Sequence, residues 1–211
     1  ERIVKEADKN SGIIILSCFY QRQHSHSGML YSRADIFNAV ENTVNWIKNK
    51  RFGNVVLEIS NEFMHDGFLY WGEGKWLVSI KGQVELIGYA KSLYPRLLVS
   101  TSGMGNGQMP DSIVQAADFV TIHFNTTRLE NYGERINTLR KSGKPVICNE
   151  DDKTGRDGAA ALALSVINGC SWGYMNNDQN QYMPFMFEGV KDDTVVYNLM
   201  KKVTTPGYVI N

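Results

Sequence analysis

Residues 55–63 read VVLEISNEF, and this stretch decides the fold that we expect. It starts with a short, nearly continuous apolar run, Val55–Ile59, and ends in the polar pair Asn61-Glu62 before an aromatic residue. Continuous apolar runs of this length are typical of strands that are buried on both faces of a parallel sheet. The stretch therefore predicts a buried parallel strand that presents an amide and a carboxyl group at its C-terminal end.

The same arrangement recurs along the chain as a short apolar run, a polar or glycine-rich loop, an amphipathic helix and a turn. The expected strands are Ile13–Leu16, Val55–Ile59, Leu97–Val99, Phe119–Ile122, Val146–Cys148 and Cys170–Tyr174. The first long helix begins at Ser32, whose side chain can form a capping box with Asp35, and Ile36, Val40, Val44 and Ile47 then form one apolar stripe. Later helices are expected at Leu77–Ser92, Asp111–Ala117, Glu134–Lys141, Ala159–Asn168 and Thr194–Lys202. This alternation predicts an α/β protein with a parallel sheet.

The length of the repeating unit favours a (β/α)8 barrel, also called a TIM barrel, and we interpret residues 1–211 as one barrel domain. Six units in 211 residues are about 35 residues each, close to the spacing of a barrel that has roughly 250 residues in eight units. Six strands do not close such a barrel, so we number them 3 to 8. We expect about 70 residues with strands 1 and 2 to come from an N-terminal segment or from another chain. An open doubly wound sheet is the competing architecture.

Composition excludes several classes of function. The chain has 22 basic and 22 acidic residues and 43% hydrophobic residues, which argues against a nucleic-acid-binding protein and against electrostatic membrane binding. No apolar run approaches the roughly 18 residues that span a bilayer. The three cysteines have no metal-ligand spacing. We therefore expect no nucleic-acid or membrane partner, no cofactor, no metal ion, and a neutral or weakly charged substrate.

A second strand also ends in a glutamate, because residues 144–150 read KPVICNE. The C-terminal ends of all strands in a barrel face one pocket, so Glu62 and Glu150 are expected to converge there. Two carboxyl groups across one pocket are what glycoside hydrolysis requires. One is protonated and donates to the leaving oxygen, while the other is ionised and attacks the anomeric carbon.

These strand-end motifs resemble the clan of retaining barrel glycosidases that includes the family 5 cellulases and mannanases. In that clan an Asn-Glu pair ends strand 4 and a glutamate ends strand 7. The resemblance covers every expected unit in the same order. It implies that Glu62 is the acid/base, that Asn61 donates to the substrate 2-hydroxyl group, and that Glu150 is the nucleophile.

The resemblance also suggests substrate-binding residues on the last expected strands. His123 ends the strand on which the clan often has His-x-Tyr, with the histidine lining the pocket and the tyrosine bonded to the nucleophile. We place Phe124 at the tyrosine position, so this bond is absent or comes from elsewhere, for which Tyr174 is the candidate. Trp172 ends the last strand, where the clan has a tryptophan as the floor of the sugar site. The alternatives are an ordinary hydrogen-bonded histidine and a core tryptophan.

Two loops carry weaker signals. Trp71 lies in an aromatic loop after Glu62 that either forms outer sugar subsites or packs on itself. His24, with His26, follows the first expected strand and can hydrogen-bond sugar hydroxyl groups, and no third metal ligand is evident. The glycine-rich residues 103–107 are interpreted as a flexible loop on the active face and not as a dinucleotide site.

The sequence thus predicts a retaining O-glycosidase that acts on a β-linked neutral oligo- or polysaccharide. Two other functions stay open at this point. One is a barrel that binds carbohydrate without catalysis. The other is an unrelated barrel lyase or isomerase, which would need a lysine or a set of metal ligands at the strand ends.

Overall fold

The computed structural model describes residues 1–23 and 30–210 of the chain. The chain divides into two compact units. The N-terminal unit comprises residues 1–104 and 109–120, and the C-terminal unit comprises residues 105–108 and 121–211. The loop segment 105–108 therefore belongs with the later half of the chain.

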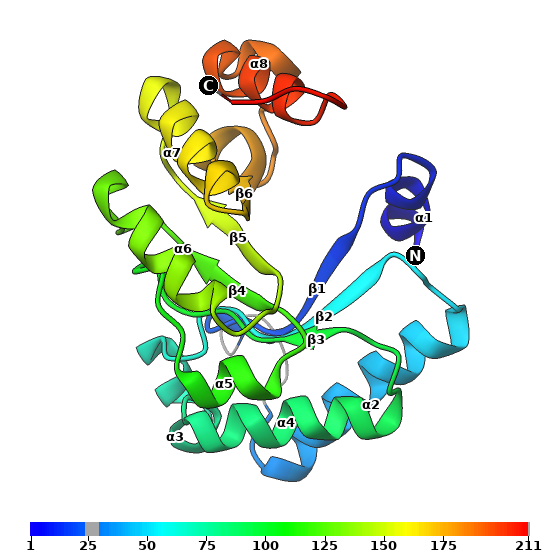
Figure 1. The fold of residues 1–211 in the computed structure, drawn as a ribbon. Helices are drawn as coiled ribbons and strands as arrows, with labels where there is room; N and C mark the ends of the chain where they lie inside the picture. Colours follow the sequence, from blue (N-terminus) through cyan, green and yellow to red (C-terminus); the bar gives the residue numbers. More distant parts are fainter. Residues whose placement is uncertain (24–29, 211) are drawn as a thin grey trace. The chain divides into compact units, whose positions relative to one another are not determined.

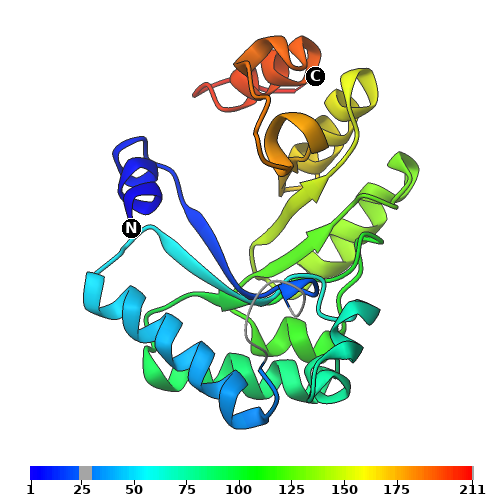
Figure 2. The same cartoon turned by 180° about the vertical axis from the view of Figure 1, so that it is seen from behind.

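The N-terminal unit is built on a sheet in the order β1-β2-β3. The strands are β1 (Ile14–Phe19), β2 (Val55–Ser60) and β3 (Val99–Ser100), and both pairs are parallel. The helices are α1 (Arg2–Lys9), α2 (Arg33–Lys50), η2 (Asp66–Tyr70), α3 (Gly74–Leu77), α4 (Ile80–Leu93) and α5 (Asp111–Ala116). Helices α2 and α4 lie side by side (Figures 1 and 2). The core of this unit lies between these helices and the sheet.

Helix α2 forms as the sequence predicts. The Ser32 side chain accepts from the Asp35 backbone N–H, and the Asp35 carboxylate accepts from the Ser32 N–H, which completes the capping box. The stripe of Ile36, Val40, Val44 and Ile47 is fully buried. Burial of each such side chain stabilises the fold by about 1.5–3 kcal/mol, so the stripe is the main reason that this helix docks.

The C-terminal unit is built on a sheet in the order β4-β5-β6. The strands are β4 (Val120–His123), β5 (Val146–Asp151) and β6 (Cys170–Tyr174), and β5 and β6 are parallel with an irregularity between Cys148 and Asp151. The helices are η3 (Leu129–Asn131), α6 (Tyr132–Arg140), α7 (Gly155–Ile167), η4 (Asn177–Gln181), η5 (Gly189–Lys191) and α8 (Thr194–Val203). Helix α7 packs against both β6 and α8 (Figures 1 and 2).

All six expected strands form, and all six expected helices begin within four residues of the predicted positions. The clearest difference is β5, which continues to Asp151, so Glu150 lies inside the strand and not after it. That residues 1–211 form one domain stays a prediction. Within the part of the chain that the structure describes, no helix is both long and apolar enough to cross a membrane.

Candidate active site

Glu62 follows β2 in an unusual backbone conformation. Its φ is +48°, in the left-handed region that residues other than glycine rarely adopt. The two other non-glycine residues with positive φ in the described chain, Ser11 and Arg51, each follow a helix. Glu62 instead follows a strand, and its N–H donates to Ser102 Oγ at 2.8 Å. Strain that persists beside a strand end is an indication of function.

Asn61 connects β2 to this strained residue. Its backbone N–H donates to the Phe19 carbonyl oxygen at 2.9 Å, which extends the pairing of β1 and β2 beyond the last strand residue. The Phe63 N–H donates to the Ser102 carbonyl oxygen at 3.1 Å, so Ser102 fixes the backbone on both sides of Glu62. The Asn-Glu pair is therefore held by hydrogen bonds from both neighbouring chain segments.

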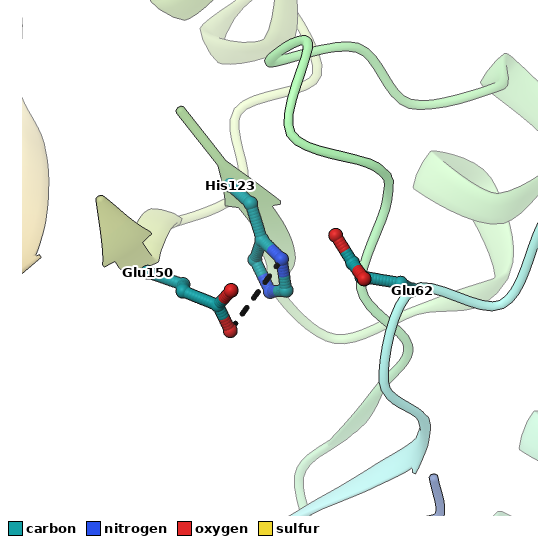
Figure 3. Close-up of side chains that lie close together, drawn as sticks. All are labelled: Glu62, His123 and Glu150. Atoms are coloured by element: carbon teal, nitrogen blue, oxygen red, sulfur yellow. Dashed lines mark ion pairs between the residues drawn. The ribbon is translucent and has the colours of Figure 1, made fainter. Parts of the chain in front are cut away.

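Glu150 has two polar partners in the C-terminal unit. Asn125 Nδ2 donates to Glu150 Oε1 at 2.8 Å. His123 Nδ1 lies 3.8 Å from Glu150 Oε2, and this histidine is fully buried at the end of β4. The dashed line in Figure 3 marks this pair. The Glu150 side chain is 22% exposed, so the carboxyl group is enclosed but accessible. An accessible carboxylate with a fixed orientation is suited to nucleophilic attack.

Asp151, the next residue, points into the core and joins four segments of this unit. The Asp151 carboxylate accepts hydrogen bonds from the Tyr132 hydroxyl, from Trp172 Nε1 at 2.7 Å and from Lys153 Nζ at 3.1 Å. Lys153 Nζ also donates to the Phe124 carbonyl oxygen at 2.8 Å. This network ties the end of β4 to β5 and β6, so it fixes the backbone on which Glu150 lies.

The pKa of Tyr132 reflects this environment. Burial raises the pKa of Tyr132 well above its usual range, and the hydrogen bond to Asp151 raises it further. The native state therefore keeps the phenolic proton at pH values where the unfolded state, with a pKa of about 10, loses it. The resulting stabilisation is fully present below about pH 10 and is lost as the pH rises above that value.

Tyr132→Phe is expected to lower the free energy of unfolding at pH 7 by about 1.5–3 kcal/mol, because a hydrogen bond to a buried carboxylate is lost. The decline in stability above pH 10 should also become shallower. Urea unfolding monitored by circular dichroism at pH 7 and pH 10.5 measures both effects. Tyr89→Phe is the matched control, because the Tyr89 hydroxyl donates to Glu41 near the surface, and it should show a smaller loss. Equal losses in both variants would contradict the role of Asp151.

Trp172, the expected floor of the sugar site, is largely buried in this structure, and its role as a sugar platform stays a prediction. Trp172 is 9% exposed and lies on the same face of β6 as the buried Cys170, while Ser171 on the other face is exposed. Its ring stacks on Tyr174, with ring centroids 5.7 Å apart. Because its Nε1 is bonded to Asp151, Trp172 is a core residue of the sheet.

Tyr174 does not supply the bond to Glu150 either. Its hydroxyl donates to Asp193 Oδ2 and accepts from Asn176 Nδ2, both at 3.1 Å. Asp193 in turn accepts from the Gly155 N–H and caps α8. Tyr174 therefore connects β6 to α7 and α8 through Asp193.

The sequence interpretation missed Asn125, which provides the bond that was sought from Tyr174. Counting two residues on from His123 in the His-x-Tyr pattern leads to Asn125, and the assignment of Phe124 to the tyrosine position was wrong. Phe124 is fully buried and stacks on Tyr132, with ring centroids 4.0 Å apart. The spacing from His123 was the signal that could have identified Asn125.

Trp71, another predicted binding residue, lies in the N-terminal unit. Trp71 is 8% exposed, and its ring packs edge-on against Phe19 and Phe68 in the core of the N-terminal unit. Trp71 therefore packs inside this unit, and a role in an outer sugar subsite stays a prediction. His24 lies outside the described residues.

The glycine-rich loop has a packing role beside β4. The Gly107 N–H donates to the His123 carbonyl oxygen at 3.0 Å, and the Gly105 carbonyl oxygen accepts from the Thr126 N–H at 3.0 Å. Gly107 has a φ of +68°, and a Cβ atom there would lie 2.4 Å from Phe124 Cε1. The loop therefore requires glycine in order to approach the residues next to His123.

Gly107→Ala is expected to lower the free energy of unfolding by about 2–3 kcal/mol, from the clash with Phe124 and the left-handed φ together. Gly143→Ala is the control, because Gly143 has a φ of +74° but no atom within 4 Å of the added Cβ. It should lose only about 1 kcal/mol from the backbone conformation. Urea titrations of both variants measure the difference, and equal losses would show that the approach to Phe124 is unimportant.

Comparisons with known proteins identify the fold. No protein-family model matches the sequence, and no curated protein matches it. The structure is similar to an endo-β-1,4-mannanase from Thermotoga petrophila, with a TM-score of 0.65 and 14% identity over 99% of this chain and 62% of the mannanase. An endo-1,4-β-mannanase from Rhizomucor miehei has a TM-score of 0.63 and 13% identity, over 95% of this chain and 75% of that enzyme.

A third similar structure is xylanase 10B from Thermotoga petrophila, with a TM-score of 0.62 and 12% identity over 95% of this chain and 76% of that chain. The chain spans less than two thirds of the length of the Thermotoga mannanase. These likenesses confirm the expected architecture. The chain has the fold of a (β/α)8 barrel, of which it supplies six βα units.

Proposed function

We propose that the chain is the larger part of a retaining glycoside hydrolase with Glu150 as nucleophile and Glu62 as acid/base. One observation carries the proposal: each glutamate lies at or just after the C-terminal end of a parallel strand, where the catalytic residues of barrel enzymes lie. The strained backbone of Glu62 and the two partners of Glu150 support it. The proposal requires the two carboxyl groups to be about 5–5.5 Å apart when substrate binds.

The reaction then proceeds in two displacements. In the first, the Glu150 carboxylate attacks the anomeric carbon, the glycosidic C–O bond breaks, and the leaving oxygen takes the Glu62 proton. The product of this step is a glycosyl ester on Glu150. In the second, water attacks the anomeric carbon and gives a proton to Glu62, while the ester C–O bond breaks and restores the Glu150 carboxylate. The sugar leaves with its original anomeric configuration.

The substrate of this proposal is a neutral polysaccharide with β-linkages. The chain has no net charge, and no single sign of charge predominates that would attract an ionic polymer. The names of the similar structures support the linkage, because they include two endo-β-1,4-mannanases and a xylanase. Mannan and xylan oligosaccharides are therefore the first substrates to test.

Barrel strands 1 and 2 belong to the same proposal. Within the described residues, β1 pairs only with β2, and β6 pairs only with β5. Each unit thus has a strand whose outer edge offers unpaired backbone groups, and such edges are normally paired or covered. We infer that two further βα units, on an N-terminal segment or on another chain, pair with these edges in the active protein.

A trapping experiment tests the nucleophile. The protein, with the two further βα units present, is screened on aryl β-glycosides and then incubated with the 2,4-dinitrophenyl 2-deoxy-2-fluoro-β-glycoside of the best sugar. Peptide mass spectrometry is expected to find one fluorosugar on Glu150. A label on another residue would overturn the assignment. Binding of oligosaccharide without hydrolysis of any glycoside would indicate a barrel that binds carbohydrate without catalysis.

A further inference from the structure

We propose that Asn125 is the positioning residue that holds the Glu150 carboxyl group in the orientation required for attack. This inference rests on the proposed function, because it gives Asn125 a role in the same reaction. It also departs from the resemblance described above, in which a tyrosine hydroxyl group bonds to the nucleophile. In this chain a side-chain amide takes that place.

The orientation of the Asn125 amide follows from the chemistry of its partner. An ionised carboxylate only accepts hydrogen bonds, so the Asn125 atom 2.8 Å from Glu150 Oε1 is the Nδ2 donor and not the carbonyl oxygen. A hydrogen bond to the charged form of a carboxyl group favours that form. An amide donor also does not titrate, in contrast to a phenol, so this bond persists over the whole working pH range.

The backbone around Asn125 is fixed by a tight turn. The Thr127 N–H donates to the Phe124 carbonyl oxygen at 2.9 Å, and Thr127 Oγ1 donates to the Gly105 carbonyl oxygen at 2.9 Å. A Cβ atom on Gly105 would lie 3.3 Å from Asn125 Cβ, so the loop closely covers this turn. Asn125 is thus positioned by packing and hydrogen bonding before substrate binds, which is what a precise site requires.

The other titratable groups near Glu150 have different partners or positions. His123 Nδ1 lies 3.8 Å from the other carboxylate oxygen, Oε2. On the buried side of β5, the Asp151 carboxylate accepts hydrogen bonds from Tyr132 and Lys153. The Cys148 thiol donates to the Glu150 backbone carbonyl oxygen at 3.5 Å, and burial raises its pKa. Asp152 is exposed. Asn125 donates to the Glu150 Oε1 atom at 2.8 Å.

Two variants test this role. In Asn125→Ala the donor to Glu150 Oε1 is lost, so the carboxylate is no longer held in one orientation. We expect kcat to fall about 10- to 100-fold with little change in KM. Asn125→Asp keeps the shape but donates only while the two carboxyl groups share a proton. We expect Asn125→Asp to be active at low pH. The alkaline limb of its kcat/KM profile should lie at least about one pH unit lower than that of the wild type.

The control is Asn106→Ala, which removes an exposed amide that bonds to Gln108 in the adjacent loop. It should leave kcat and the pH profile unchanged. If Asn125→Ala folds and keeps the wild-type kcat, or if Asn125→Asp loses kcat at low and high pH alike, Asn125 does not orient Glu150 and the inference is overturned. If Asn125→Ala does not fold, the isosteric Asn125→Asp variant decides alone.

The outcome also separates this inference from the proposed function. Should the fluorosugar fail to label Glu150 in the wild-type protein, the proposed function fails first. Should it label Glu150 at equal rates in the wild type and in both Asn125 variants across pH 4–8, only the role of Asn125 is overturned.

Discussion

Glu150→Gln is expected to lower kcat by roughly 10⁵- to 10⁶-fold, the scale of removing a catalytic nucleophile. Glutamine keeps the shape of the side chain and can still accept from Asn125 Nδ2, so the fold should be unchanged. Hydrolysis of the best aryl β-glycoside measures the loss. Glu134→Gln is the control, because Glu134 lies on α6 with a side chain that is 72% exposed. Residual activity above about one per cent of wild type would contradict the nucleophile assignment.

The smaller variant Glu150→Ala makes the same prediction more specific. It leaves space beside Asn125 that a small external nucleophile can occupy. Azide is expected to restore turnover of a dinitrophenyl glycoside and to yield a glycosyl azide of inverted configuration, because a single displacement replaces two. If azide restores nothing in a folded variant, Glu150 does not occupy the position from which the anomeric carbon is attacked.

Glu62→Gln is expected to show an effect that depends on the leaving group. Substrates with poor leaving groups should lose roughly 10²- to 10⁴-fold in kcat, because proton donation to the leaving oxygen is absent. For a 2,4-dinitrophenyl glycoside the first step needs no proton. A burst of dinitrophenolate should therefore be followed by slow steady-state release, since no base activates water in the second step.

Azide should accelerate that steady state in Glu62→Gln, because an anionic nucleophile needs no base. Stopped-flow absorbance with and without azide measures the burst and its rescue. Glu85→Gln is the control from an exposed position on α4 in the same unit. An equal loss for good and poor leaving groups would show that Glu62 does not donate the proton.

The architecture could be read from the sequence because each local signal agrees with the barrel. The apolar runs are short and continuous, as buried parallel strands require, and all of them form strands. The capping box at Ser32 and the stripe from Ile36 to Ile47 fix where α2 begins and which face it buries. Agreement between local and global preferences is typical of a sequence that encodes one fold.

The sequence did not predict which face of the sheet each strand side chain occupies. Side chains alternate along a strand, so an apolar run such as Cys170–Tyr174 is compatible with either face. The irregularity in β5 between Cys148 and Asp151 changes the alternation just before the acidic pair. As a result Asp151, and not Glu150, is the carboxylate that meets Trp172 in the core.

Residue roles that depend on long-range contacts were also difficult to predict from the sequence. The spacing from His123 points to Asn125, but its contact with Glu150 also depends on the register of β4 and β5, which the Phe124 N–H to Glu150 carbonyl bond of 2.9 Å sets. The loop glycines were expected to be flexible, yet Gly107 is a close-packing residue against Phe124. This packing role of Gly107 has no signature in the local sequence.

The stereochemistry of the first sugar released tests the central claim most directly. Proton NMR of a freshly started reaction on a β-linked oligosaccharide or aryl β-glycoside distinguishes the two anomers before mutarotation. Action of Glu62 and Glu150 on one glycosidic bond by double displacement predicts that the β-anomer appears first. Initial release of the α-anomer would mean inversion, with carboxyl groups too far apart for a covalent intermediate, and would contradict the account.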